Sequence, residues 1–77
     1  MAITLFSAEW CSNCKVVYKI LEGMDLEYSI IDADTEQGQE LCVEYGIRSL
    51  PTMIDDVDEN IYVGLQQIKS FLESVNE

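Results

Sequence analysis

Histidine is absent from this 77-residue chain, and basic residues are scarce. A nucleophile that pairs cysteine with histidine, as in many proteases, is therefore excluded. Four lysines and arginines stand against fifteen aspartates and glutamates, which gives a net charge of -11. This charge opposes binding to nucleic-acid phosphates and to anionic membranes, and it favours a solvated surface or a basic partner. We therefore expect neither nucleic acid nor a membrane among the partners.

Long apolar runs are also missing. No segment approaches the length that crosses a membrane, and residues 1–6 lack the basic start of a signal peptide. We therefore expect a cytoplasmic protein. Prolines and glycines are few, while 48% of the residues are hydrophobic, so the chain should fold as a packed globule. Its length leaves room for one domain, residues 1–77, which we expect to be a monomer.

Cysteine is present three times, an odd number that suits no secreted disulfide scaffold. Cys11 and Cys14 stand three apart in the segment W-C-S-N-C-K, and a C-x-x-C pair in a reducing compartment indicates either redox chemistry or a metal site. Cys42 lies in a predicted helix, where a free cysteine usually packs as a small buried apolar residue. A regulatory or dimer-forming thiol is the alternative for Cys42.

The first half of the chain reads as strand, helix, strand. The apolar run over residues 2–6 predicts a buried strand that ends just before the cysteine motif. Apolar residues at helical spacing then predict a helix from about Cys11 to Glu22, with Gly23 as its stop. Residues 26–31 predict a second strand. A crossover of this length implies a parallel pair with a right-handed connection.

The second half adds a helix, a hairpin and a last helix. Asp34 and Gln37 resemble a capping box that opens a helix ending at Gly46, with Leu41 and Tyr45 facing inward. Strands over 52–56 and 60–63 should pair antiparallel because their connection is short. Between them, a solvated hairpin is expected to hold the acidic run of Asp55, Asp56, Asp58 and Glu59. The last helix should dock on the sheet through the stripe Leu65, Ile68, Leu72 and Val75.

Two motifs, W-C-S-N-C-K and the Y-G-I-R-S-L-P-T that runs from Tyr45 to Thr52, resemble the thioredoxin superfamily. The resemblance covers essentially the whole chain, whose length is similar to a glutaredoxin-type core. It implies a minimal thioredoxin fold of the α/β class, in the order βαβαββα, with a four-stranded mixed sheet flanked by three helices. The extra N-terminal strand and helix of full thioredoxins are not expected.

The chain departs from this family pattern at three places. Ser12 and Asn13 separate the cysteines, where thioredoxins usually have Gly-Pro and many glutaredoxins Pro-Tyr. Leu5 corresponds to the buried acid of thioredoxins, so water or a neighbouring group must take the proton of the second thiol. Gly64 begins a segment that lacks the Gly-Gly-x-x-Asp pattern with which glutaredoxins hold glutathione.

The predicted chemistry is thiol–disulfide exchange. A helix N-terminus stabilises a thiolate, so we assign Cys11 as the exposed nucleophile and Cys14, a turn further in, as the resolving thiol. The resemblance implies that the two form a redox-active disulfide, with no other cofactor and no metal bound. Lys15 could lower the pKa of Cys11 or could simply be solvated.

The resemblance also implies a docking surface beside the cysteines. Pro51 would be a cis-proline packed against the motif, which leaves the backbone of Leu50 able to pair with an extended client. The residues expected to contact the client are Trp10, Leu50, Pro51, Thr52 and Gly64.

Several functions remain open at this point. The resemblance favours an electron carrier that reduces disulfide-containing client proteins, with ribonucleotide reductase as one candidate, and that is re-reduced by an NADPH-linked thioredoxin reductase. The first alternative is a glutathione-dependent glutaredoxin. The second is a metal or iron–sulfur module built on the C-x-x-C, which would need further ligands from a carboxylate, glutathione or a second chain. The third is a redox-inert interaction subunit that retains the fold.

Overall fold

A computed structural model describes residues 2–75 of the chain. The elements follow the order β1 (Ala2–Ser7), α1 (Ser12–Glu22), β2 (Glu27–Asp32), α2 (Glu36–Tyr45), β3 (Thr52–Asp55), β4 (Ile61–Val63) and α3 (Gly64–Val75). This is the predicted βαβαββα order, and each strand and helix lies within one or two residues of its expected place. The α/β fold class predicted from the sequence is confirmed.

The strands form one four-stranded mixed sheet in the order β2-β1-β3-β4. β1 pairs parallel with β2 and antiparallel with β3, and β3 pairs antiparallel with β4. The parallel pair arises because α1 carries the chain back before β2 begins, whereas the short connection between β3 and β4 permits only an antiparallel turn. The cysteine motif lies at the end of the sheet where β1 ends and β3 begins.

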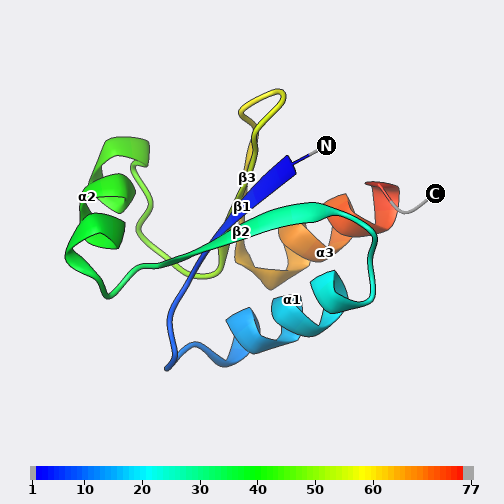
Figure 1. The fold of residues 1–77 in the computed structure, drawn as a ribbon, viewed down its shortest axis with the longest axis horizontal. Coiled ribbons are helices and arrows are strands. Elements are labelled where there is room, and N and C mark those ends of the chain that lie inside the picture. The colour runs from blue at the N-terminus through cyan, green and yellow to red at the C-terminus, as the bar shows by residue number, and fades with distance from the viewer. Residues whose placement is uncertain (1, 76–77) are drawn as a thin grey trace.

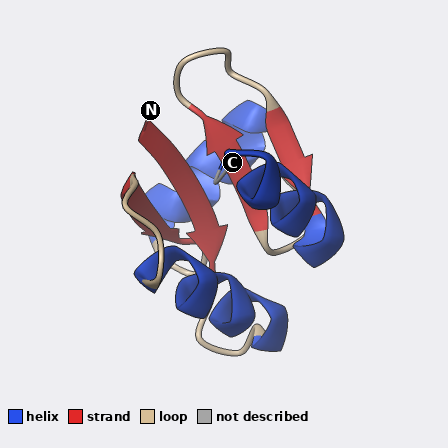
Figure 2. Ribbon diagram, turned by 90° about the vertical axis from the view of Figure 1, so that its right-hand side faces the viewer, coloured by secondary structure: helices blue, strands red, loops and turns tan. Residues whose placement is uncertain are grey.

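Helices cover both faces of the sheet. α1 and α3 lie side by side on one face, and α2 lies on the other, as the two views in Figure 1 and Figure 2 show. The main core forms under α1 and α3, where alternate residues of the central strands meet the apolar stripes of the two helices. Its buried members are Ile3, Leu5, Val17, Leu21, Met53, Ile68 and Leu72.

The start of α2 differs from the predicted capping box. Thr35, not Asp34, is the N-cap, and its Oγ1 accepts a hydrogen bond from the N–H of Gly38 at 2.9 Å. The same hydroxyl donates to the carbonyl of Asp32 at 2.8 Å. A threonine hydroxyl can do both at once, whereas an aspartate carboxylate can only accept. The helix start is therefore tied directly to the end of β2.

The end of α2 agrees with the prediction more closely. Gly46 closes the helix in the left-handed conformation, with φ 69°. Leu41 is half-buried, but Tyr45 is 46% exposed, so its expected inward placement is only partly right. The Tyr45 ring still meets the ring of Phe6 edge-on, with centroids 6.2 Å apart. This contact links the last residue of α2 to β1.

The hairpin between β3 and β4 is solvated, with one exception. Asp55 is only 2% exposed, and its Oδ1 accepts a hydrogen bond from the N–H of Val57 at 2.9 Å. The expectation that Asp55 is solvated is therefore wrong, because its carboxylate caps the turn from inside. At the outer edge of β4, the N–H of Val63 donates to Oε1 of Gln67 in α3 at 2.9 Å.

Candidate functional site

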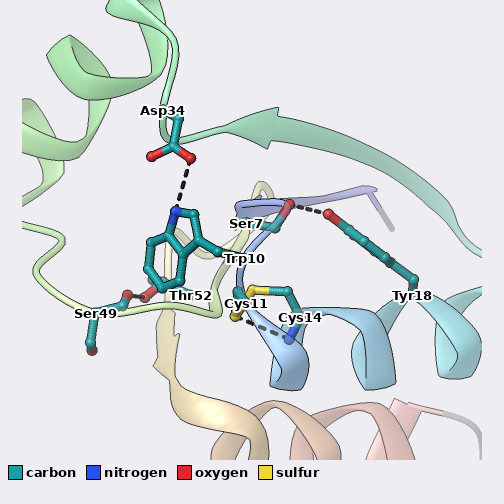
Figure 3. The surroundings of a disulfide bond; sticks show 8 residues. All are labelled: Ser7, Trp10, Cys11, Cys14, Tyr18, Asp34, Ser49 and Thr52. Atoms are coloured by element: carbon teal, nitrogen blue, oxygen red, sulfur yellow. Dashed lines mark hydrogen bonds between the residues drawn. A yellow bond between two sulfur atoms is a disulfide. The ribbon is translucent and has the colours of Figure 1, made fainter.

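The cysteine motif begins α1 at the carboxyl end of β1. Cys11 is the N-cap of the helix, with an extended backbone, and its Sγ accepts a hydrogen bond from the N–H of Cys14 at 3.2 Å. The first N–H groups of a helix have no partner within the helix, and here one of them faces a sulfur atom (Figure 3). A thiolate at Cys11 would gain from this bond and from the positive end of the helix.

Cys11 and Cys14 form a disulfide in the structure, with their Cα atoms 5.2 Å apart. Cys14 is fully buried and Cys11 is 6% exposed. The expectation that Cys11 is exposed is therefore wrong, although Cys11 retains some exposed surface and Cys14 retains none. Around them packs a small cluster formed with Ala8, Tyr18 and Leu50. Only the Cys11 side of the pair reaches the surface.

The loop before β3 forms a wall of the site beside the cysteine motif. The Leu50–Pro51 peptide bond is cis. The carbonyl of Pro51 accepts a hydrogen bond from the N–H of Gly64 at 2.9 Å, and Gly64 itself has φ 88°. The loop and the start of α3 are therefore joined at the backbone. This brings Leu50, Pro51 and Gly64 to the same end of the sheet as the motif.

Thr52 plays a different part from the one expected. Its side chain is 1% exposed, and its Oγ1 donates to the carbonyl of Ser49 at 2.6 Å (Figure 3). The hydroxyl therefore fastens the loop around Pro51 and is turned away from any docking client. Pro51 is also buried, so Leu50 and Gly64, both half-buried, are the members of this wall that reach the surface.

Trp10 is the most exposed aromatic side chain at the motif. It is 69% exposed, which makes it a surface residue, as the predicted docking role requires. Its Nε1–H donates to Oδ2 of Asp34 at 2.9 Å. Figure 3 shows Asp34 reaching the indole from the segment between β2 and α2. Sequence reasoning considered Asp34 only as a helix cap, because nothing in the sequence signals a contact 24 residues away.

An open groove lies next to the motif. Asn13, from between the cysteines, lines it together with the β4–α3 junction, including Val63, Gly64 and Gln67. Lys15 is exposed on α1 but does not line this groove.

Within residues 2–75, no group of three or more Cys, Asp or Glu side chains is placed to hold a metal ion. The same part of the chain has no helix that is both long and apolar enough to cross a membrane.

Comparison with known proteins identifies the family. The family model for thioredoxin matches residues 1–77. A thioredoxin of Rickettsia bellii is 35% identical over 78 residues, which cover 92% of this chain and 74% of that relative. The chain belongs to the thioredoxin family. Family membership and the paired Cys11 and Cys14 together support a thiol–disulfide oxidoreductase.

Solved structures agree with this assignment. A mutant thioredoxin from Halobacterium salinarum NRC-1 is 27% identical and superposes with a TM-score of 0.76, over 97% of this chain and 71% of that one. A mutant of the thioredoxin-like protein BC3987 superposes with a TM-score of 0.77 over 97% of this chain and 99% of that one, at 21% identity. The second likeness shows the fold alone, in a chain that is matched over nearly its whole length.

Leu5, which the resemblance matches to the family's buried acid, belongs to the main core. Leu5 is fully buried on β1, so this chain has an apolar side chain where thioredoxins are expected to have a carboxylate. A polar contact that the sequence did not signal lies nearby. Ser7, which is 1% exposed, forms a hydrogen bond through its Oγ with the hydroxyl of Tyr18. The only hint in the sequence is that Tyr18 follows Cys14 by one helical turn.

Cys42 is less buried than the sequence predicted. It is a free, half-buried thiol on α2, so the expected full burial is wrong. Burial still raises the pKa of the Cys42 thiol above its ordinary value, because desolvation disfavours the thiolate. A thiol in this state is a weak nucleophile at neutral pH.

Proposed function

We propose that the protein is a protein-disulfide reductase of the thioredoxin type, in which Cys11 is the nucleophile and Cys14 the resolving thiol. The observation that carries this proposal is the placement of Cys11 as the N-cap of α1, with the N–H of Cys14 directed at its sulfur at 3.2 Å. The pair is re-reduced by an NADPH-linked thioredoxin reductase. We propose that the protein acts in the cytoplasm and as a monomer.

The reaction moves two electrons in two exchanges. The Cys11 thiolate attacks one sulfur of the client disulfide, which forms a mixed disulfide and releases the other client sulfur as a thiolate. Cys14 then loses its proton and attacks the Cys11 sulfur. The Cys11–Cys14 disulfide forms, and the second client thiolate leaves and takes up a proton. The client disulfide is reduced as the protein's own pair is oxidised.

Access to the pair supports this order. Only Cys11 has exposed surface, so a client sulfur can approach Cys11 but not Cys14. Trp10 and the backbone of Leu50 flank this opening, and the groove that starts at Asn13 adds an adjoining depression. An extended client segment would pair with the Leu50 backbone and pack against the indole. Ribonucleotide reductase is one candidate client.

The test is NADPH consumption coupled to the reduction of a protein disulfide such as that of insulin. One reaction contains a thioredoxin reductase, and a parallel reaction contains glutathione with glutathione reductase. We expect turnover in the first reaction only. Turnover in the glutathione reaction alone would replace the proposal with a glutaredoxin function. If neither reaction shows turnover, the proposed re-reduction by a thioredoxin reductase is contradicted.

Matched variants assign the activity to the motif. Cys11→Ser should abolish turnover, because Cys14 is fully buried and Cys42, whose pKa is raised by burial, lies outside the cluster around the disulfide. Cys42→Ser should leave turnover unchanged, because Cys42 lies on α2, outside the cluster that surrounds the disulfide. Metal content after purification without chelators separates the remaining alternative, since a metal or iron–sulfur module would retain stoichiometric metal that is lost in Cys11→Ser.

A further inference from the structure

The resolving thiol lacks the acid that family relatives are expected to place beside it. In the described part of the chain, the buried polar and charged side chains are those of Ser7, Thr52 and Asp55. Asp55 is the only carboxylate among them, and it pairs with Ile3 in the sheet register. Thr52 pairs with Phe6, at the end of β1 that leads into the motif. Asp55 therefore lies toward the opposite end of the strands from Cys14.

At the motif end of the sheet, the hydroxyls to consider are those of the buried Thr52 and Ser7 and of the half-buried Tyr18. Thr52 has a single hydroxyl proton, which it donates to the carbonyl of Ser49 at 2.6 Å. It therefore has no proton left to offer a sulfur atom. The other hydroxyls are those of Ser7 and Tyr18, which are hydrogen-bonded to each other.

Both members of this pair are held near Cys14 by the elements that carry them. Ser7 is the last residue of β1. Tyr18 lies one turn after Cys14 on the same side of α1, and its ring packs against the cluster of Ala8, Cys11 and Cys14. Figure 3 shows the phenol reaching across from α1 to the Ser7 hydroxyl, on the Cys14 side of the disulfide.

The pair has one proton more than its mutual bond uses. Two hydroxyl groups carry two protons, and one of them lies in the hydrogen bond between Ser7 and Tyr18. The second proton needs an acceptor outside the pair. When the disulfide is reduced, the sulfur of Cys14 becomes an acceptor within the cluster that Tyr18 contacts, and a thiolate is a stronger acceptor than a neutral group.

We propose that the Ser7–Tyr18 hydroxyl pair donates a hydrogen bond to the sulfur of Cys14 in the dithiol form and stabilises its thiolate for the resolving step. The inference rests on the exchange function proposed above. In that step the proton of Cys14 leaves to solvent, the thiolate attacks the Cys11 sulfur, and the client thiolate departs. The hydroxyls keep their own protons throughout and supply only the hydrogen bond.

The test measures Cys14 alone, without a client or a reductase. In a Cys11→Ser, Cys42→Ser background, Cys14 is the one remaining thiol, and the ultraviolet absorbance of its thiolate is followed against pH. Tyr18→Phe and Ser7→Ala should each raise the pKa of Cys14. The expected effect is about tenfold less thiolate at a given pH below that pKa, which corresponds to about 1.4 kcal/mol.

Control variants separate this role from simple packing. Tyr28→Phe removes a hydroxyl from a 38% exposed tyrosine on β2 and should leave the titration of Cys14 unchanged. Ser7→Thr retains a hydroxyl and should restore the parent titration, which a packing effect would not do. The charged residues on the motif and on the elements beside it are unaltered in every variant. They are Glu9, Lys15, Lys19, Asp32, Asp34, Arg48 and Lys69, all of them exposed, and they include the register partner of Ser7 and the hydrogen-bond partner of Trp10.

Kinetics supply an independent reading in the chain with both motif cysteines. Release of a client from the mixed disulfide should slow by about tenfold in Tyr18→Phe. The rate at which Cys11 is alkylated should not change.

An unaltered Cys14 titration in Ser7→Ala and Tyr18→Phe would overturn the inference, and if one variant does not fold, the other decides. Because the titration needs no turnover, it can fail while disulfide reduction succeeds, and the reverse.

Discussion

The indole of Trp10 donates a hydrogen bond to the carboxylate of Asp34 at 2.9 Å, which links the cysteine motif to the start of α2. Asp34 is itself held by the turn that follows β2, where its backbone N–H donates to Oδ1 of Asp32 at 2.9 Å. A tryptophan that is 69% exposed would otherwise sample several rotamers. The contact therefore keeps a large apolar surface in one position beside Cys11.

Removal of the Asp34 carboxylate should loosen Trp10. In Asp34→Ala the indole loses its acceptor, so its fluorescence anisotropy should fall and the KM for a protein disulfide should rise several-fold. Trp10 is the only tryptophan, so the fluorescence reports on this site alone. The free energy of unfolding should change by no more than about 1 kcal/mol, because the bond is exposed. Asp34→Asn retains an acceptor oxygen and is the matched control.

Replacement of the buried cysteine should trap the client. In Cys14→Ser, Cys11 can still attack a disulfide, but no thiol is available to resolve the product. We expect a stable mixed disulfide between Cys11 and the client, visible as a single mass increase in a mass spectrum without reductant. If the adduct formed instead in Cys11→Ser, the roles of the two cysteines would be reversed.

Gly38 should be intolerant of a side chain. A Cβ at this position would overlap the carbonyl oxygen of Asp32 and lie 2.9 Å from Oγ1 of Thr35. Gly38→Ala should therefore lower the free energy of unfolding by about 1 to 3 kcal/mol, although alanine is otherwise the better helix former. Urea denaturation measures the change.

Gly23→Ala provides the comparison for that experiment. Its nearest neighbour would be the carbonyl oxygen of Ile20 at 3.6 Å, an ordinary contact, and its φ of -86° suits any residue. The stability of this variant should be unchanged or slightly raised. Equal losses in the two variants would contradict the close approach of α2 to the end of β2.

Cys42 should react slowly and with a defined pH dependence. Its pKa is raised by burial, so the folded state holds the thiol proton more tightly than the unfolded state, whose thiols ionise near about pH 8.5. Its contribution to stability is therefore full below that value and is lost as the pH rises through the folded pKa.

Iodoacetamide labelling of the oxidised protein, in which Cys42 is the free cysteine, should be several-fold slower at pH 8 than in urea. Equal rates would contradict this.

Much of the fold could be read from the sequence because short-range periodicity decides it. The stripe that includes Ile68 and Leu72 is buried as predicted, and the short link after Asp55 does give an antiparallel pair. Local patterns were less reliable where two polar residues compete for one role. Asp34 and Thr35 are both good N-caps, and the choice depends on the carbonyl of Asp32, which the sequence does not place.

The candidate site was predictable only in part for the same physical reason. Cys11 and Cys14 can be recognised in the sequence because their three-residue spacing places them one helical turn apart. The partners of Trp10 and Ser7, by contrast, come from other elements and become neighbours only when the sheet and helices assemble. Thr52 is the opposite case: the family motif predicts a client contact, but the side chain is buried and its hydroxyl donates to the carbonyl of Ser49.

The hydrogen bond from Val63 to Gln67 has a consequence for the behaviour of the chain at high concentration. β4 is an edge strand, and Ile61 and Val63 on it are 44% and 43% exposed, which are features that promote aggregation by strand pairing. The side chain of Gln67 occupies the N–H that a neighbouring molecule would use. One amide on α3 thus interrupts the row of backbone groups that would let sheets join into fibrils.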